Sequence, residues 1–113
     1  SEDALKDLGE ELRDRYGPVP AVVQNALHLM SLRIKAKGLG VRKIKFSAGH
    51  LVINLQRAHL LTPVEQTHLK SELRGSRVSA ESIAWEVPSD LLTALRHVLQ
   101  ALEVCRLQMP TPA

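Results

Sequence analysis

The fold is decided where the chain reads Glu11-Leu12-Arg13-Asp14-Arg15-Tyr16-Gly17-Pro18-Val19-Pro20. Gly17 is predicted to end one helix, because glycine readily adopts the left-handed backbone conformation that follows many helix ends. Pro18 and Pro20 suit the entry of the next helix, since proline fixes φ and lacks an N–H that the first turn would leave unpaired. This stretch therefore predicts two consecutive helices joined by a short turn.

Apolar residues at helical spacing extend this pair in both directions. Leu5, Leu8 and Leu12 recur at core spacing and predict a first helix from about Glu2 to Tyr16. Two stripes predict a second helix that reaches about Lys37 and packs on two sides, as the spine of the domain. The stripes are Val23, Leu27, Met30 and Ile34, and Val22, Leu29, Leu32 and Ala36.

A β-hairpin is predicted after the break at Gly38-Leu39-Gly40. Apolar residues alternate with lysines over residues 43–46, and alternation resumes over residues 51–55. The turn residues Ser47-Ala48-Gly49 lie between the two segments. The two segments are therefore expected to pair as antiparallel strands.

The second half of the chain predicts helix, strand and helix. Thr62-Pro63-Val64-Glu65 has capping-box spacing and opens a helix to about Arg74. Residues 77–87 predict one bent strand or a tight second hairpin, and a last helix is predicted from about Ser89 to Gln108. The order α-α-β-β-α-β(β)-α indicates an α+β domain with a small, mainly antiparallel sheet packed against helices.

Length and composition indicate one globular domain, residues 1–113, with residues 109–113 as a flexible tail. The 113 residues are 44% hydrophobic and 24% charged, close to globular averages and unlike disordered chains. No apolar run approaches the roughly 18 to 20 residues that span a bilayer, so no membrane partner is expected. The single cysteine gives no sign of an oxidising compartment, and a cytoplasmic location is expected.

The sequence predicts no catalytic, metal or cofactor site. The five histidines never approach a metal-ligand spacing. Gly38 and Gly40 begin a dinucleotide-type pattern, but Lys43 stands where its third glycine belongs and the segment follows a helix. Cys105 lies in an apolar helical stripe and is interpreted as a small core residue. The chain is therefore not expected to be an enzyme.

The last predicted helix has a stripe that two arrangements could explain. Leu91, Leu95, Val98, Leu102 and Cys105 recur at heptad-like spacing. A core face is the favoured interpretation, with a monomer expected. A homodimer through Leu95 and Leu102 is the alternative.

Charge is distributed unevenly, because residues 15–64 contain no aspartate or glutamate. Lysines and arginines at this density could form a phosphate-binding patch for nucleic acid, or they could simply be a solvated face. Aromatic residues are only 3%, and Trp85, Tyr16 and Phe46 are interpreted as core or junction residues, so no stacking platform for single strands is expected. The solvated face is favoured. The alternative patch comprises Arg33, Lys35, Lys37, Arg42, Lys43 and Lys45.

The first predicted helix has an acidic side. Asp7, Glu11 and Asp14 recur at i, i+4 and i+7 and share one exposed face. Asp14 falls in the last turn, where the helix dipole disfavours a carboxylate by up to about 1 kcal/mol. Either Asp14 accepts hydrogen bonds from Arg15 or from the start of the second helix, or Glu11 and Asp14 meet arginines on a partner.

These residues resemble a known family. The stretch 11–20, together with Leu32-Arg33-Ile34-Lys35-Ala36-Lys37-Gly38-Leu39-Gly40-Val41-Arg42-Lys43-Ile44, is similar to the C-terminal domain of the bacterial transcription-repair coupling factors. The similarity is specific over roughly residues 1 to 45, and beyond them only the order of elements matches. Gly38 before Leu39 is a small departure from the family pattern.

The resemblance implies a regulatory role. In that family an ATP-driven translocase that displaces stalled RNA polymerase lies in other domains. The C-terminal domain packs on the domain homologous to the repair helicase UvrB and masks the surface that recruits UvrA. The resemblance thus implies an autoinhibitory clasp in a bacterial cytoplasmic protein, with Glu11 and Asp14 forming salt bridges to arginines of the UvrB-homology domain.

Overall fold

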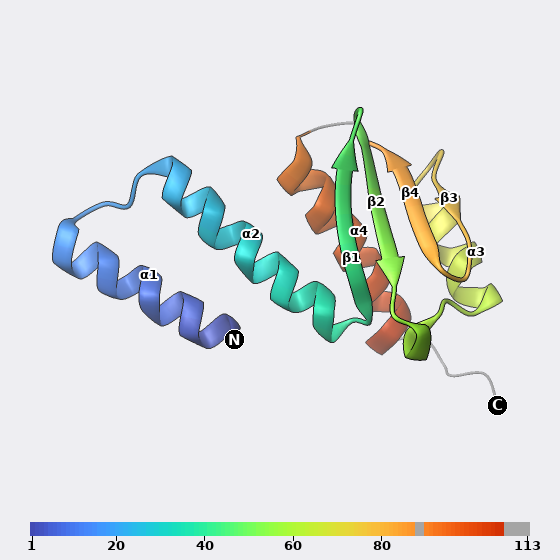
Figure 1. Ribbon diagram of the computed structural model, residues 1–113, viewed down its shortest axis with the longest axis horizontal. Helices are drawn as coiled ribbons and strands as arrows, with labels where there is room; N and C mark the ends of the chain where they lie inside the picture. The colour runs from blue at the N-terminus through green and yellow to red at the C-terminus, as the bar shows by residue number, and fades with distance from the viewer. Residues whose placement is uncertain (88–89, 108–113) are drawn as a thin grey trace.

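The computed structural model describes residues 1–87 and 90–107 and has the predicted α+β fold (Figure 1). The elements are α1 (Glu2–Tyr16), α2 (Ala21–Gly38), β1 (Val41–Ser47), β2 (His50–Leu55), a short 3-10 helix η1 (Arg57–His59), α3 (Pro63–Glu72), β3 (Arg77–Val78), β4 (Ser82–Glu86) and α4 (Leu91–Leu107). The predicted order is confirmed, and the segment 77–87 forms a second hairpin rather than one bent strand. The tail predicted for residues 109–113, and the last helix's predicted ends at Ser89 and Gln108, lie outside the described residues.

Helices α1 and α2 form the predicted pair. Gly17 has φ 81° and its N–H donates to the carbonyl of Arg13, which closes α1. Pro20 directly precedes the first residue of α2. The predicted core role of α1 is wrong, however, because none of its residues is buried. Leu8 is exposed because α2 is the element that α1 packs against, and one neighbour cannot enclose its leucines.

Only one side of α2 belongs to the core. Ala36 is buried, and Leu29 and Leu32 pack against the core. On the other predicted stripe, Met30 and Ile34 are 48% and 36% exposed. Helix α2 thus packs on two sides as predicted, on α1 and on the core, but Met30 and Ile34 of the second stripe stay largely exposed.

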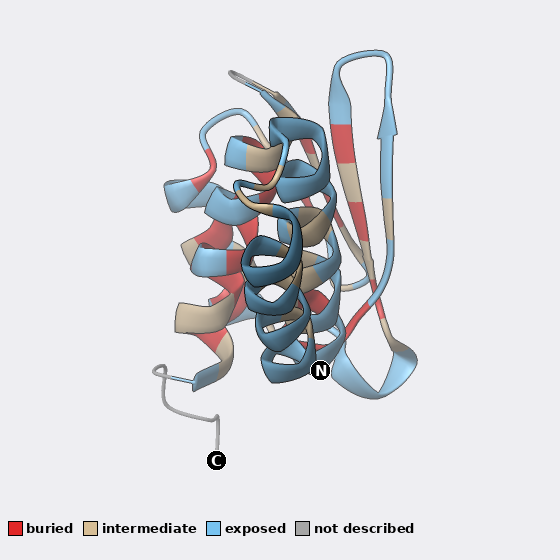
Figure 2. Cartoon of the chain, turned by 90° about the vertical axis from the view of Figure 1, so that its left-hand side faces the viewer, coloured by how far each residue is buried: buried red, intermediate tan, exposed pale blue. Residues whose placement is uncertain are grey.

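The four strands form one antiparallel sheet in the order β1-β2-β4-β3. Strand β2 is central, and its alternate residues Leu51, Ile53 and Leu55 are buried. Helices α3 and α4 lie behind the sheet in Figure 1, while no helix of the described residues lies on its front face. Figure 2 shows the same one-sided arrangement edge-on. The core thus lies between one face of the sheet and the helices.

Helix α4 contributes the largest share of the core. Seven of its residues are buried, and Leu95 and Leu102 have no exposed surface. This confirms the core-face interpretation and leaves no exposed seam for the dimer that was the alternative. Asp90 starts the helix by accepting hydrogen bonds from the N–H and the hydroxyl of Thr93, and these bonds lower the pKa of its carboxyl.

The three aromatic residues do not share one role. Trp85 is buried as predicted, with its Nε1–H donating to the carbonyl of Arg74 and its ring edge-on to His97. Tyr16 and Phe46 are exposed, so neither is a core residue, but Tyr16 does lie at a junction, where α1 meets the connecting turn. Tyr16 is the last residue of α1, whose end has few neighbours, and Phe46 lies near the tip of the β1–β2 hairpin.

Gly40 allows the chain to turn from α2 into β1. Its φ is 89°, in the left-handed region that favours glycine. A Cβ atom added at this position would lie 2.5 Å from the Cβ of His59. The carbonyl of Gly40 also accepts a hydrogen bond from the N–H of Gln56. Gly40 therefore lets β1 begin directly against η1.

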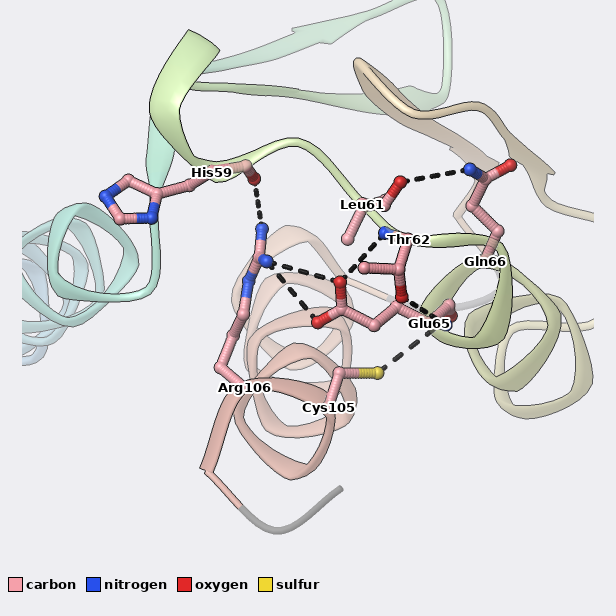
Figure 3. A network of polar contacts seen from close by, with 7 residues as sticks. All are labelled: His59, Leu61, Thr62, Glu65, Gln66, Cys105 and Arg106. Atoms are coloured by element: carbon pink, nitrogen blue, oxygen red, sulfur yellow. Dashed lines mark hydrogen bonds and ion pairs between the residues drawn. The ribbon is translucent and has the colours of Figure 1, made fainter. Parts of the chain in front are cut away.

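A polar network holds the end of α4 to the start of α3 (Figure 3). Thr62 and Glu65 form the predicted capping box, with the Glu65 carboxylate accepting from the Thr62 N–H at 2.9 Å. The same carboxylate lies 3.3 Å from the Arg106 guanidinium, which also donates to the carbonyl of His59. Both ionic side chains are mostly buried, so the network fixes how the two helices meet.

Candidate functional site

The α1–α2 hairpin exposes more apolar surface than any other part of the described chain. Six of the ten large hydrophobic side chains that are exposed in the described residues lie on it. They are Leu8, Tyr16, Val22, Val23, Met30 and Ile34. In Figure 1 the hairpin extends to one side of the sheet, and α1 lies farthest from the core. An exposed concentration of this kind is typical of an interaction surface.

The two sides of the hairpin differ in chemistry. One side has a groove of about 450 Å³ that includes the charged residues Lys6, Glu10 and Arg13 in its lining. A second hollow, of about 290 Å³, is lined by Leu12, Tyr16, Val23 and the residues of the connecting turn. Leu8 lies one turn from Leu12, and Met30 lies two turns from Val23, so both continue this second, apolar side.

The acidic residues predicted on α1 share a face that the helix period places roughly opposite its leucines. Asp7, Glu11 and Asp14 are all exposed. Glu11 Oε1 lies 3.2 Å from Arg15 Nη2, an exposed pair of a kind that contributes only about 0.3 to 0.5 kcal/mol. Neither Glu11 nor Asp14 is buried, and neither makes a strong contact with the residues that the structure describes.

The local explanation for Asp14 is wrong. Arg15 pairs with Glu11, and the Val23 and Gln24 N–H groups at the start of α2 donate to the carbonyl of Pro20. Among residues 1–87 and 90–107, no side-chain hydrogen bond or ion pair involves the Asp14 carboxylate. Its carboxylate therefore faces solvent in the last turn of α1, where the helix dipole disfavours it.

The six basic residues of the alternative phosphate patch do not share one surface. Lys35 is partly buried and lies 2.8 Å from Glu103 of α4. Arg33 and Lys37 are exposed on α2, one turn apart. Arg42, Lys43 and Lys45 are exposed on β1. These six residues thus do not form one contiguous patch, because the helix period and the α2–β1 turn send neighbouring side chains to different faces.

Two kinds of reactive group that the sequence raised, metal ligands and the lone thiol, can be checked in the structure. Within the described residues, no group of three or more histidine, cysteine, aspartate or glutamate side chains is arranged to hold a metal ion. Cys105 is buried, as predicted, and burial raises the pKa of its thiol to about 11, which disfavours the reactive thiolate. None of the helices in the described part is long and apolar enough to cross a membrane.

The molecule belongs to the class of α+β domains in which a helical hairpin extends from an antiparallel sheet covered on one face. The model of the TRCF domain family matches residues 1–66, which comprise the hairpin, β1, β2 and the start of α3. This is more than half of the chain, and the chain belongs to the TRCF domain family. The motif resemblance that the sequence showed is therefore confirmed.

The fold agrees with this assignment. A solved structure described as the C-terminal domain of transcription-repair coupling factor superposes with a TM-score of 0.72 at 18% sequence identity. The match covers 90% of this chain and 70% of the solved one. A comparison with curated proteins found no match.

Sequence reasoning missed two features of the surface. The exposure of Met30 and Ile34 was hidden because an apolar stripe looks the same whether it packs in the core or faces solvent. Arg77 was not singled out, because its place at the other end of the cross-strand row that begins at Lys45 depends on sheet order. The exposure of Met30 and Ile34 could have been inferred from the two apolar stripes of α2, which together are wider than one neighbouring helix can cover.

Proposed function

We propose that this domain is a non-catalytic autoinhibitory clasp of a transcription-repair coupling factor. Its α1–α2 hairpin docks on the UvrB-homology domain of the same protein and masks the surface that recruits UvrA. The observation that carries the proposal is that α1 buries none of its residues although it is a regular helix of 15 residues. An isolated helix of this length has only marginal stability in water, so a partner that covers α1 would stabilise it.

The acidic side supplies orientation in this proposal. Glu11 and Asp14 are placed to receive arginines of the UvrB-homology domain in bidentate pairs, which are directional as well as attractive. The Glu11–Arg15 pair is exposed and weak, so Glu11 can exchange it for a new partner at little cost. Asp14 has no side-chain partner in the described residues that it would have to give up.

The apolar side supplies most of the binding free energy. Ion pairs at a surface contribute roughly 0 to 1 kcal/mol each, too little to hold a clasp closed with two carboxylates. Burying a whole Met or Ile side chain contributes about 1.5 to 3 kcal/mol, so covering the exposed parts of Met30, Ile34 and Val23 adds a few kcal/mol. A contact of this strength stays reversible when another state of the protein competes for it.

The rest of the proposal concerns the parent protein. Its ATP-dependent DNA translocase lies outside this domain, and UvrA and RNA polymerase are partners of the domain only through the parent. A bacterial cytoplasmic location completes the proposal. The points on the parent protein are supported by the family membership of residues 1–66, and the location rests on the sequence resemblance alone.

Charge reversal in the full-length protein tests the clasp. Glu11→Lys combined with Asp14→Lys is expected to weaken the intramolecular contact and to increase the affinity for UvrA. The matched control reverses two exposed acids on the other side of the molecule, Glu72→Lys and Glu81→Lys, and should leave that affinity unchanged. Unchanged UvrA affinity in the Glu11/Asp14 variant, with circular dichroism showing an intact fold, would exclude these residues from the mechanism.

A further inference from the structure

The strand register defines which side chains occupy the uncovered face of the sheet. Leu51, Ile53 and Leu55 of β2 are buried on the helix side, so Val52 and Asn54 lie on the opposite side. Directly paired residues share a face, which places Lys45 beside Val52 and Lys43 beside Asn54. This is the face turned to the viewer in Figure 1.

A row of directly paired residues crosses the sheet, with a cationic side chain at each end and small side chains between them. Lys45 pairs with Val52, Val52 with Ala84, and Ala84 with Arg77, so the row crosses all four strands. Three strand spacings separate its ends by about 14 Å. Both end residues are exposed, whereas the two between them are short and partly buried.

A second row lies alongside the first. Lys43 pairs with Asn54, and Asn54 pairs with Ser82. Lys43 is about 7 Å from Lys45 along β1, since two residues of a strand separate side chains on one face. The floor between the three cations thus consists of small or polar side chains, with hydrogen-bonding groups from Asn54 and Ser82.

The cations of this face are not neutralised within the described chain. No ion pair to Lys43, Lys45 or Arg77 is formed by residues 1–87 and 90–107. Glu86 is the one acid that the register places on this face, and it pairs with His50 at the far end of β2 from Asn54. The sheet therefore presents a flat, cationic surface that is separate from the hairpin.

We propose that this face binds the phosphate backbone of duplex DNA, with Lys43, Lys45 and Arg77 as the phosphate contacts. Cations on the two edge strands, with an uncovered sheet face between them, suit a chain of phosphates that crosses the sheet. The side chains of Asn54 and Ser82 can add hydrogen bonds to phosphate oxygens. The rows contain no aromatic side chain, so unpaired bases find nothing to stack on and a duplex is favoured over a single strand. The contact is independent of base sequence.

Titration of a fluorescently labelled 20-base-pair duplex at increasing salt tests the proposal. Three phosphate contacts predict a log–log slope near −3, so that the affinity falls by about 500-fold between 20 and 200 mM salt. The variant Lys43→Glu/Lys45→Glu/Arg77→Glu should lose binding at 20 mM salt. The variant with glutamine at the same three positions should also bind weakly, with little salt dependence, which separates lost contacts from repulsion.

A matched variant controls for net charge. Arg33→Glu/Lys37→Glu/Arg96→Glu reverses three exposed cations that lie on helices, and either triple reversal takes the formal net charge from +3 to −3, because each substitution removes two charges. The proposal requires the sheet variant to lose much more affinity than the helix variant. Equal losses would overturn it in favour of a general charge effect. Binding of poly-glutamate as tight as that of the duplex, with the same dependence on the sheet residues, would overturn the assignment to nucleic acid.

Discussion

Replacing Gly40 by alanine should destabilise the domain more than the same change at any other glycine of the described residues. The residue has φ 89°, and a side chain in this left-handed region costs about 1 to 2 kcal/mol. The new Cβ would also lie 2.5 Å from the Cβ of His59, an atom next to the backbone that cannot rotate away. Displacing η1 to relieve such a contact costs about 1 to 3 kcal/mol. The sum is about 3 kcal/mol, or a melting temperature lower by roughly 10 to 15 °C.

Gly38 provides the internal control, two residues away. It is the last residue of α2, and a Cβ there would meet no atom within 4 Å. Gly38→Ala should therefore stabilise the domain by about 0.5 kcal/mol, because alanine favours helix and restricts the unfolded chain. Urea unfolding followed by circular dichroism measures both variants. A loss below about 1 kcal/mol for Gly40→Ala, or equal effects of the two substitutions, would refute the assigned role of Gly40.

Three further predictions concern the polar network, the hairpin and the buried thiol. Glu65→Ala removes the partner of both the Thr62 N–H and Arg106 and should lower the free energy of unfolding in urea by about 3 kcal/mol. Glu65→Gln keeps an acceptor for the Thr62 N–H and should lower it by about half as much. Equal losses for the two variants would contradict the capping role. Met30→Gln with Ile34→Gln should change unfolding by less than about 1 kcal/mol, yet weaken docking on the UvrB-homology domain at least tenfold, and unaltered docking would place the interface elsewhere. Burial raises the pKa of Cys105 to about 11 from 9.0, so the unfolded chain loses its proton first and stability should fall as pH rises from 9 towards 11. Cys105→Ala should remove that part of the alkaline loss, and an identical pH profile in the two proteins would contradict it.

Local chemistry made the element order predictable from the sequence. Gly17 ends α1 through its positive φ, and the capping box at Thr62 begins α3 as its spacing indicated. These signals act within a few residues, so tertiary contacts rarely override them. The heptad-like stripe of α4 was also assigned to the correct environment, since a helix with so wide an apolar face needs a core around it.

Exposure was predicted less well, because it depends on which elements become neighbours. The stripes on α1 and α2 have core spacing, yet Leu8 and Met30 face solvent since the hairpin has only one side against the core. The basic residues were grouped by sequence, whereas the helix period and the sheet register separate Lys35 from Lys45 and bring Arg77 to the same row as Lys45. Long-range pairing of this kind has no local signature.

The clasp is tested most directly by calorimetric titration of this chain with the UvrB-homology domain of the same protein, at low and at high salt. We expect saturable binding that persists but weakens at high salt, because the apolar side of the hairpin remains while the ion pairs are screened. Glu11→Lys with Asp14→Lys should weaken it further, and the sheet variant Lys43→Glu/Lys45→Glu/Arg77→Glu should not. Absence of binding at low salt, or binding that depends on the sheet cations rather than on the hairpin, would contradict the clasp.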